Sequence, residues 1–254
     1  TTFARYSLNE TQEYGIVDGE FVTRIEGRPY DDYQVTNETH PLSKVRLLAP
    51  VEPSKIIAIG LNYKSHLGDK TPPSVPEPFL KTPSSVIGPD DTIIIPREAL
   101  QDNINIQEEA ELTVVISRRC KRVNKNDALN YVLGYTCGND VSGRPWQRDD
   151  LSWWRAKSSD TFTSIGPVIV TDLDPFNLDL KARVNGNTAQ DSNTSDLLYD
   201  LPTIIEFVTR AMTLEPGDVI MTGTPGEPVD IKGGDSVEIE LEGVGILRNP
   251  VKNE

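Results

Sequence analysis

The stretch 107–147 reads QEEAELTVVISRRCKRVNKNDALNYVLGYTCGNDVSGRPWQ. Apolar residues recur at every second position from 112 to 116, a period that predicts a β-strand whose side chains point alternately to opposite faces. Glu109 and Glu111 then share one face, with about 3.3 Å of rise per residue and roughly 7 Å between the two positions. Asp140 follows after an intervening predicted helix. Three carboxylates on one side of a hard cation leave positions open for water or substrate, so this pattern indicates one Mg²⁺ site.

An acidic pair in a chain this acidic also fits a solvated face, and the strand period alone does not choose between the two interpretations. The 254 residues carry 39 acidic and 25 basic side chains, a formal net charge of −14. Such a charge argues against binding of nucleic acid or of an anionic membrane surface. An anionic substrate would therefore need local positive charge at its binding site. No apolar run reaches the eighteen or so residues that a membrane-spanning helix needs.

Several short motifs follow one another from about Pro53 to the end of the chain. They are Glu109-Ala110-Glu111-Leu112, Gly134-Tyr135-Thr136, Asn139-Asp140-Val141-Ser142, Lys157-Ser158, Asp160-Thr161-Phe162, Gly166-Pro167 and Thr222-Gly223-Thr224-Pro225-Gly226. In this order they resemble the fumarylacetoacetate hydrolase family, in particular its branch of acylpyruvases, oxaloacetate decarboxylases and 2-hydroxyhepta-2,4-diene-1,7-dioate isomerases. The resemblance implies that Glu109, Glu111 and Asp140 bind Mg²⁺ or Mn²⁺. It also implies a β-roll-like core around the metal, usually in a homodimer.

Many short strands and few helices favour a mixed, β-rich α+β fold. Residues 1–50 are predicted to form a small N-terminal β domain, and residues 51–254 the catalytic domain. Within the first domain, Asp18-Gly19-Glu20 is a hairpin signal, whereas the polar stretch 31–43 shows no period and is predicted to be a loop. Further predictions are a short helix at 126–133, a hairpin at Asn185-Gly186, an amphipathic helix that opens at Asp200, and a final strand at 237–241.

His66 follows the motif Gly60-Leu61-Asn62-Tyr63, and a segment rich in Gly, Lys and Pro comes directly after it. A lone histidine is more often structural, but this composition predicts a loop instead of a core position. In the family, a histidine at this place lies on a lid with a glutamate three residues on, and the pair activates a water. Here that third residue is Asp69, which is one methylene shorter. The resemblance therefore implies a catalytic pair of His66 and Asp69 whose geometry departs from the family pattern.

The resemblance also supplies candidates for the positive charge that an anionic substrate needs. It implies a catalytic Lys157 near the metal or the substrate. Five further residues are expected to line the substrate pocket: Lys81, Arg144, Gln147, Gly223 and Thr224. Taken singly, each of the three cations would equally fit a solvated surface position.

The predicted chemistry follows from the metal. A 2-oxo acid can chelate Mg²⁺ through its carboxylate and keto oxygens, and the cation then stabilises the enolate left when the adjacent bond breaks. We therefore expect cleavage of a carbon–carbon bond in a small 2-oxo acid or 1,3-diketo acid. Water activated by His66 would give acylpyruvate-type hydrolysis, and loss of CO₂ would give oxaloacetate-type decarboxylation. The alternatives are an isomerase or hydratase of a catechol-degradation intermediate, and a catalytically silent member that binds metal or oxo acid. Cys120 and Cys137 lack partners for a zinc site and are expected to be reduced thiols in a cytoplasmic protein.

Overall fold

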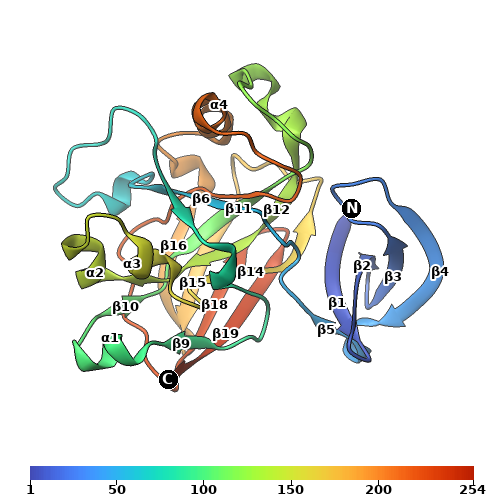
Figure 1. Cartoon of the computed structure of the whole chain (residues 1–254), viewed down its shortest axis with the longest axis horizontal. Helices are drawn as coiled ribbons and strands as arrows, with labels where there is room; N and C mark the ends of the chain where they lie inside the picture. Colours follow the sequence, from blue (N-terminus) through green and yellow to red (C-terminus); the bar gives the residue numbers. More distant parts are fainter.

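The computed structural model describes all 254 residues and contains many strands and few helices, as the sequence predicts (Figure 1). The first strands form a lobe beside the main body: β1 (Thr2–Leu8), β2 (Thr11–Asp18), β3 (Phe21–Glu26), β4 (Gln34–Pro41) and β5 (Arg46–Leu47). The other strands are β6 (Ile56–Gly60), β7 (Glu77–Lys81), β8 (Val86–Ile87), β9 (Ile93–Ile95), β10 (Ile106–Gln107), β11 (Ala110–Ile116), β12 (Val132–Asp140), β13 (Ser142–Gly143), β14 (Thr163–Val170), β15 (Asp179–Val184), β16 (Asn187–Asn193), β17 (Val219–Met221), β18 (Ser236–Leu241) and β19 (Gly245–Asn253).

Helices are short and lie between the strands. The α-helices are α1 (Arg97–Gln101), α2 (Arg144–Asp149), α3 (Trp154–Ser158) and α4 (Leu201–Ala211), and 3₁₀ turns cover Leu42–Lys44, Lys64–His66, Pro83–Ser85, Lys125–Tyr131 and Thr194–Asp196. None of these helices combines the length and the apolar content needed to cross a lipid bilayer.

Three sheets organise the chain. The largest has 12 strands in the order β4-β3-β2-β1-β14-β12-β11-β17-β6-β7, with β5 and β8 added at its side. A second sheet has five strands in the order β16-β15-β18-β19-β9, and β10 pairs with β13 in a third. The strand β11 pairs with β12 on one side and with β17 on the other, so it lies inside the large sheet. A central strand is covered on both faces and can be apolar on both.

The two faces of β11 pack into two different cores. All seven of its residues are buried. Leu112, Val114 and Ile116 belong to a cluster of 34 buried residues, whereas Val115 belongs to a separate cluster of 12. Successive side chains of β11 therefore point alternately into the two clusters, and this produces the two-residue period in the sequence. Glu111 projects from the same face as Thr113 and Val115, where it is buried, and such burial requires a partner for its charge.

The N-terminal lobe joins the main body through β1, which pairs with β14 at Thr2 and Phe3. The loop predicted at 31–43 is wrong, because β4 lies there and pairs with β3. This strand is at the edge of the sheet and most of its side chains are exposed, so it has no apolar face to produce a period. The hairpin signal at 18–20 is confirmed by the pairing of β2 with β3.

Four other predictions concern the main body. The helix expected at 126–133 is a 3₁₀ helix that ends at Tyr131, because Val132 already belongs to β12. The strand at 237–241 exists as β18 but is not the last, since β19 follows and pairs with both β18 and β9. The hairpin at Asn185-Gly186 is confirmed, with φ values of 52° and 79°. The Asp200 side chain caps α4 by accepting a hydrogen bond from the Thr203 amide at 3.0 Å.

Candidate active site

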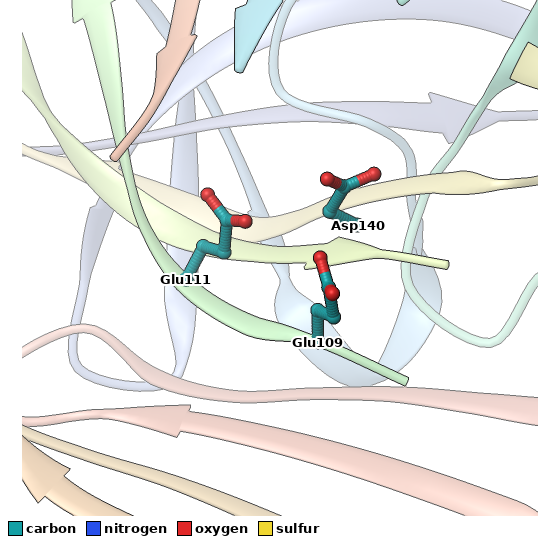
Figure 2. Close-up of side chains that lie close together, drawn as sticks. All are labelled: Glu109, Glu111 and Asp140. Atoms are coloured by element: carbon teal, nitrogen blue, oxygen red, sulfur yellow. The ribbon is translucent and has the colours of Figure 1, made fainter. Parts of the chain in front are cut away.

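Three carboxylates converge at the start of β11 and the end of β12. Glu109 directly precedes β11, Glu111 is its second residue, and Asp140 is the last residue of β12. The antiparallel register sets Ala110 opposite Asn139, and the Asp140 amide donates to the Glu109 carbonyl at 3.0 Å. Figure 2 shows the three side chains directed toward one common space. One oxygen from each carboxylate lies within 4.8 Å of the others, and all three residues are buried.

The environment separates the pKa values of the two glutamates. Burial alone would raise the pKa of Glu109, but the cations of Lys157 and Arg144 outweigh it and hold the pKa of this carboxyl below its usual range. Burial and the neighbouring carboxylates of Asp140 and Glu109 raise the pKa of Glu111 well above its usual range. The cluster therefore lacks one positive charge on the Glu111 side, which a divalent cation between the three carboxylates would provide.

The residues present fit Mg²⁺ or Mn²⁺. All three donors are carboxylate oxygens, which hard divalent cations prefer, and they converge from one side only. The backbone amide of Gly223 donates to Glu111 Oε2 at 2.7 Å, which orients this carboxylate. The amide of Glu109 donates to Asn139 Oδ1 at 2.9 Å. Contacts of this kind from outside the ligand set fix the ligands before a cation binds.

Lys157 lies where the sequence predicts positive charge. Its ammonium donates to Glu109 Oε2 at 2.8 Å, to Asp140 Oδ2 at 2.8 Å and to Ser142 Oγ at 2.6 Å. Burial would lower the pKa of Lys157, but Asp140 and Glu109 overcome this and raise it, so the side chain is a cation at neutral pH. It lines the cavity that the carboxylates also line, within reach of a bound anion.

Lys81 has a different place from the one predicted. Its ammonium is completely enclosed and bonds to Asp140, to the Lys157 carbonyl and to the Phe162 carbonyl, the last at 3.0 Å. Burial lowers the pKa of Lys81, against the opposing effect of Asp140. Because this ammonium is enclosed and does not line the cavity, its contacts in the structure are those of a counter-ion to Asp140.

Arg144 and Gln147 come from the first turn of α2. The Arg144 guanidinium donates to Glu109 Oε1 at 2.5 Å, to Gln107 Oε1 at 2.6 Å and to Gln147 Oε1 at 2.9 Å. The guanidinium is thus bonded to a predicted metal ligand, and it lines an outer groove instead of the inner cavity. Gln147 lines both.

His66 reaches the site from the 3₁₀ turn after β6, but Asp69 does not accompany it. The ring Nδ1 of His66 lies 2.7 Å from the carbonyl oxygen of Gly226. A carbonyl oxygen only accepts, so this contact places the proton of the neutral ring on Nδ1 and leaves the Nε2 lone pair free. Asp69 is exposed and forms no hydrogen bond with the ring. The tautomer of the His66 ring is therefore set by the Gly226 carbonyl, and not by Asp69, its expected partner in the pair.

The turn 222–226 contributes two of the predicted residues. Gly223 has a φ of 107°, and a β-carbon there would lie 2.8 Å from the β-carbon of Asn62. Only glycine therefore fits, and its amide reaches Glu111 instead of a substrate. Thr224 lines the inner cavity. Gln190 of β16 donates to Thr224 Oγ1 at 2.8 Å.

The inner cavity is small and continues outward. Its volume is about 100 Å³, and Phe79 and Trp153 form its apolar side, with ring centroids 5.1 Å apart. The outer groove of about 910 Å³ shares His66, Lys70 and Gln147 with it. A small polar molecule thus fits inside, and a longer one would extend into the groove.

Two participants that the sequence did not predict are the Gly226 carbonyl and Gln190. The Gly226 carbonyl is a backbone atom, and no side-chain pattern could indicate it. Gln190 lies in a polar strand of the second sheet, 80 residues from its backbone partner Ala110, and nothing local marks it. The packing of the two sheets brings Gln190 to the site, whereas the Gly226 carbonyl comes from the turn after β17, the neighbour of β6 in the large sheet.

Comparison with known proteins supports the family resemblance that the sequence motifs indicate. Residues 55–252 match the family model described as fumarylacetoacetate (FAA) hydrolase C-terminal, and residues 2–50 match the model described as Rv2993c-like, N-terminal. The mitochondrial oxaloacetate tautomerase fahd2 of Xenopus laevis is 40% identical over 224 residues, which cover 82% of this chain and 69% of that one.

Solved structures extend the comparison to the whole chain. The 5-carboxymethyl-2-hydroxymuconate delta-isomerase of Mycobacterium smegmatis is 41% identical, with a TM-score of 0.93 and full coverage of both chains. The maleylpyruvate hydrolase of Sphingobium sp. SYK-6, solved with manganese(II) and pyruvate, is 30% identical, with a TM-score of 0.83 over 100% of this chain and 99% of that one. The resemblance seen in the sequence is thus confirmed: the chain belongs to the fumarylacetoacetate hydrolase family of enzymes.

Proposed function

We propose that this protein is a metal-dependent enzyme that converts small 2-oxo dicarboxylic acids, such as oxaloacetate, through their enolate, and that it interconverts their keto and enol forms. The observation that carries this proposal is the contact between His66 Nδ1 and the Gly226 carbonyl. It leaves Nε2 as a single positioned base at a cavity that also holds the three carboxylates. Keto–enol interconversion needs one base to move a proton between carbon and oxygen.

A divalent cation held by Glu109, Glu111 and Asp140 would supply Lewis acidity toward the keto oxygen of the substrate. The chain itself supplies the other requirements. His66 Nε2 takes the proton from the carbon beside the ketone and delivers it to the keto oxygen to give the enol, and moves it back to carbon in the reverse direction. The Lys157 ammonium attracts the carboxylate. Phe79 and Trp153 keep one side of the cavity apolar, which strengthens these electrostatic interactions.

The charge balance favours a dianion. The three cations Lys81, Lys157 and Arg144 equal the three carboxylates in number, although their ion pairs are with Glu109 and Asp140 and leave Glu111 without one. A bound divalent cation would therefore leave the site with a net positive charge of about two. An anionic substrate would be repelled by the overall charge of −14, but the local positive charge acts at short range and outweighs the distant acidic surface.

Cleavage of a carbon–carbon bond is the second candidate. It is favoured by the likeness to the hydrolase that was solved with manganese(II) and pyruvate, a product-sized oxo acid. Water placed beside His66 Nε2 would lose its proton to the ring and attack a distal carbonyl of an acylpyruvate. Decarboxylation of oxaloacetate would need no such water. Both reactions use the enolate that the first candidate forms.

One set of assays separates these reactions. Purified protein is stripped of metal with a chelator, reloaded with Mg²⁺ or Mn²⁺, and given oxaloacetate or acetylpyruvate. We expect metal-dependent acceleration of the keto–enol interconversion of oxaloacetate, followed by enol absorbance. Release of pyruvate at a comparable rate would favour decarboxylation, and consumption of acetylpyruvate would favour hydrolysis. The proposal fails if the reloaded protein does none of these while it still binds the metal.

A further inference from the structure

We propose that Gln190 is a positioning residue of this site. Its side-chain amide fixes the Thr224 hydroxyl as a hydrogen-bond donor toward the carboxylate of a bound 2-oxo acid. This inference rests on the proposed function, because it names a partner for the same substrate. It concerns a residue on β16, a strand of the five-stranded sheet that contains none of the three metal-site carboxylates.

The Gln190 amide is buried and fully used. Its oxygen accepts from the Ala110 amide at 2.9 Å, and its nitrogen donates to Thr224 Oγ1 at 2.8 Å and to the Pro225 carbonyl at 2.5 Å. The side-chain orientation is unambiguous, because an amide N–H must meet an acceptor and a carbonyl must meet a donor. Both N–H bonds of Gln190 are thereby committed, and only 4% of the residue is exposed.

This contact determines which way the Thr224 hydroxyl donates. A hydroxyl has one hydrogen and two acceptor positions. Since Oγ1 accepts from Gln190, the hydrogen must point elsewhere, and Thr224 has no other hydrogen-bond partner within the chain. Thr224 lines the inner cavity together with Lys157 and His66. An acceptor within the cavity, such as a carboxylate oxygen of the substrate, is the natural partner for that hydrogen.

The Gln190 side-chain amide also connects the turn 222–226 to the start of β11. Ala110 is the residue between Glu109 and Glu111, so the acceptor end of Gln190 holds the backbone that carries two metal ligands. The donor end holds the turn at Thr224 and Pro225. The length of one glutamine side chain therefore sets the spacing between the cation site and the hydroxyl. A chelating oxo acid must span this spacing to contact both.

The test uses oxalate, a stable mimic of a 2-oxo acid, and calorimetric measurement of its Kd with the protein saturated in Mn²⁺. Gln190→Met keeps the side-chain length but removes all three hydrogen bonds, and Thr224→Val removes the hydroxyl. We expect each change to weaken oxalate binding about tenfold, which is typical for one hydrogen bond to a charged group. If Gln190 acts through Thr224, the double variant is no weaker than Thr224→Val alone.

Asn249 offers a matched control. Like Gln190 it is a buried side-chain amide with two donated hydrogen bonds, here to the backbone carbonyls of Gly88 at 2.9 Å and Asp91 at 2.8 Å, and it lies outside the inner cavity. We expect Asn249→Leu to lower the Tm of the metal-free protein by as much as Gln190→Met does, and to leave the Kd of oxalate unchanged. If Asn249→Leu weakened oxalate binding as much as Gln190→Met does, the role of Gln190 would be a general structural one, and the proposal would be overturned. So would additive effects of the Gln190 and Thr224 changes.

Gln190→Glu provides a second variant should Gln190→Met fail to fold. It keeps an acceptor for the Ala110 amide but has no N–H for Thr224 or Pro225, and it too should weaken oxalate at least tenfold. Unchanged oxalate affinity in a folded variant, with a wild type that turns over oxaloacetate, refutes the role of Gln190 alone. A wild type that binds oxalate yet turns over no oxo acid refutes the proposed function alone. No oxalate binding by the wild type refutes both.

Discussion

The cavity has two sides that are built very differently. On one side is the carboxylate wall, formed by Glu109, Glu111 and Asp140 on paired strands inside the large sheet. On the other is the lid segment 64–76, which begins with a 3₁₀ turn and then has no regular secondary structure. The wall is held by a backbone ladder and buried ion pairs. The lid segment is held by a few hydrogen bonds, such as Tyr199 Oη to the Pro73 carbonyl at 2.6 Å.

This difference separates two kinds of mutational effect. Groups in the wall are fully desolvated and bonded to one another, so removing one leaves a buried charge without its partner. Most side chains of the lid segment stay in contact with water, so removing one of these costs little folding free energy. We therefore expect changes in the wall to alter both stability and chemistry, and changes in the lid segment to alter chemistry alone.

The largest effect is expected for Asp140→Asn. This change removes the charge of one proposed metal ligand, and with it a partner that Lys157 and Lys81 share. Lewis acidity contributes several kcal/mol, so turnover should fall by about 1,000-fold or more. Thermal denaturation with increasing Mn²⁺ gives a readout independent of activity, since the rise in Tm seen for the wild type should disappear. A variant that is still stabilised by Mn²⁺ would remove Asp140 from the ligand set.

Lys81→Met tests the carboxylate wall separately from the cavity, because Lys81 pairs with Asp140 but does not line the cavity. It leaves Asp140 without one of its two buried cations, and breaking such a pair costs about 3 kcal/mol of unfolding free energy. Urea denaturation measures this loss, and saturating Mn²⁺ should restore part of it by supplying positive charge. If the variant were as stable as the wild type but bound substrate more weakly, Lys81 would be a substrate ligand after all.

His66→Gln tests the lid segment. Glutamine can still donate to the Gly226 carbonyl but cannot act as a base, so kcat for keto–enol interconversion should fall about 100-fold. Because His66 is only half-buried, the Tm should stay within about 1 °C of the wild type. A large drop in Tm would mean that this part of the lid segment is as tightly built as the wall.

The smallest effect is expected for Asp69→Asn. The carboxylate is exposed and the Gly226 carbonyl already sets the tautomer of the His66 ring, so kcat and KM should each change less than about twofold. Steady-state kinetics beside the His66→Gln variant provide the comparison. A loss as large as that of His66→Gln would show that Asp69 moves to the ring when substrate binds, and that the pair expected from the family pattern does operate.

Much of the site was predictable because its signals are local. The alternation at 112–116 and the two-residue spacing of Glu109 and Glu111 fix one face of one strand, whatever the rest of the chain does. The motif around Asp140 and the family order of motifs supplied the third ligand and Lys157. The loop predicted at 31–43 was wrong because no such local signal exists there. An edge strand whose side chains are mostly exposed carries no apolar period.

What the sequence by itself determined is therefore the set of groups that carry charge and the strands that present them, since side-chain type and strand period are properties of the chain. Only the tertiary structure decided how those groups are paired. It enclosed Lys81 behind Asp140, gave the tautomer of His66 to a backbone carbonyl instead of Asp69, and brought Gln190 from the second sheet to Thr224. The physical reason is that a hydrogen bond depends on distances of about 3 Å between atoms far apart in the chain, and packing alone sets such distances.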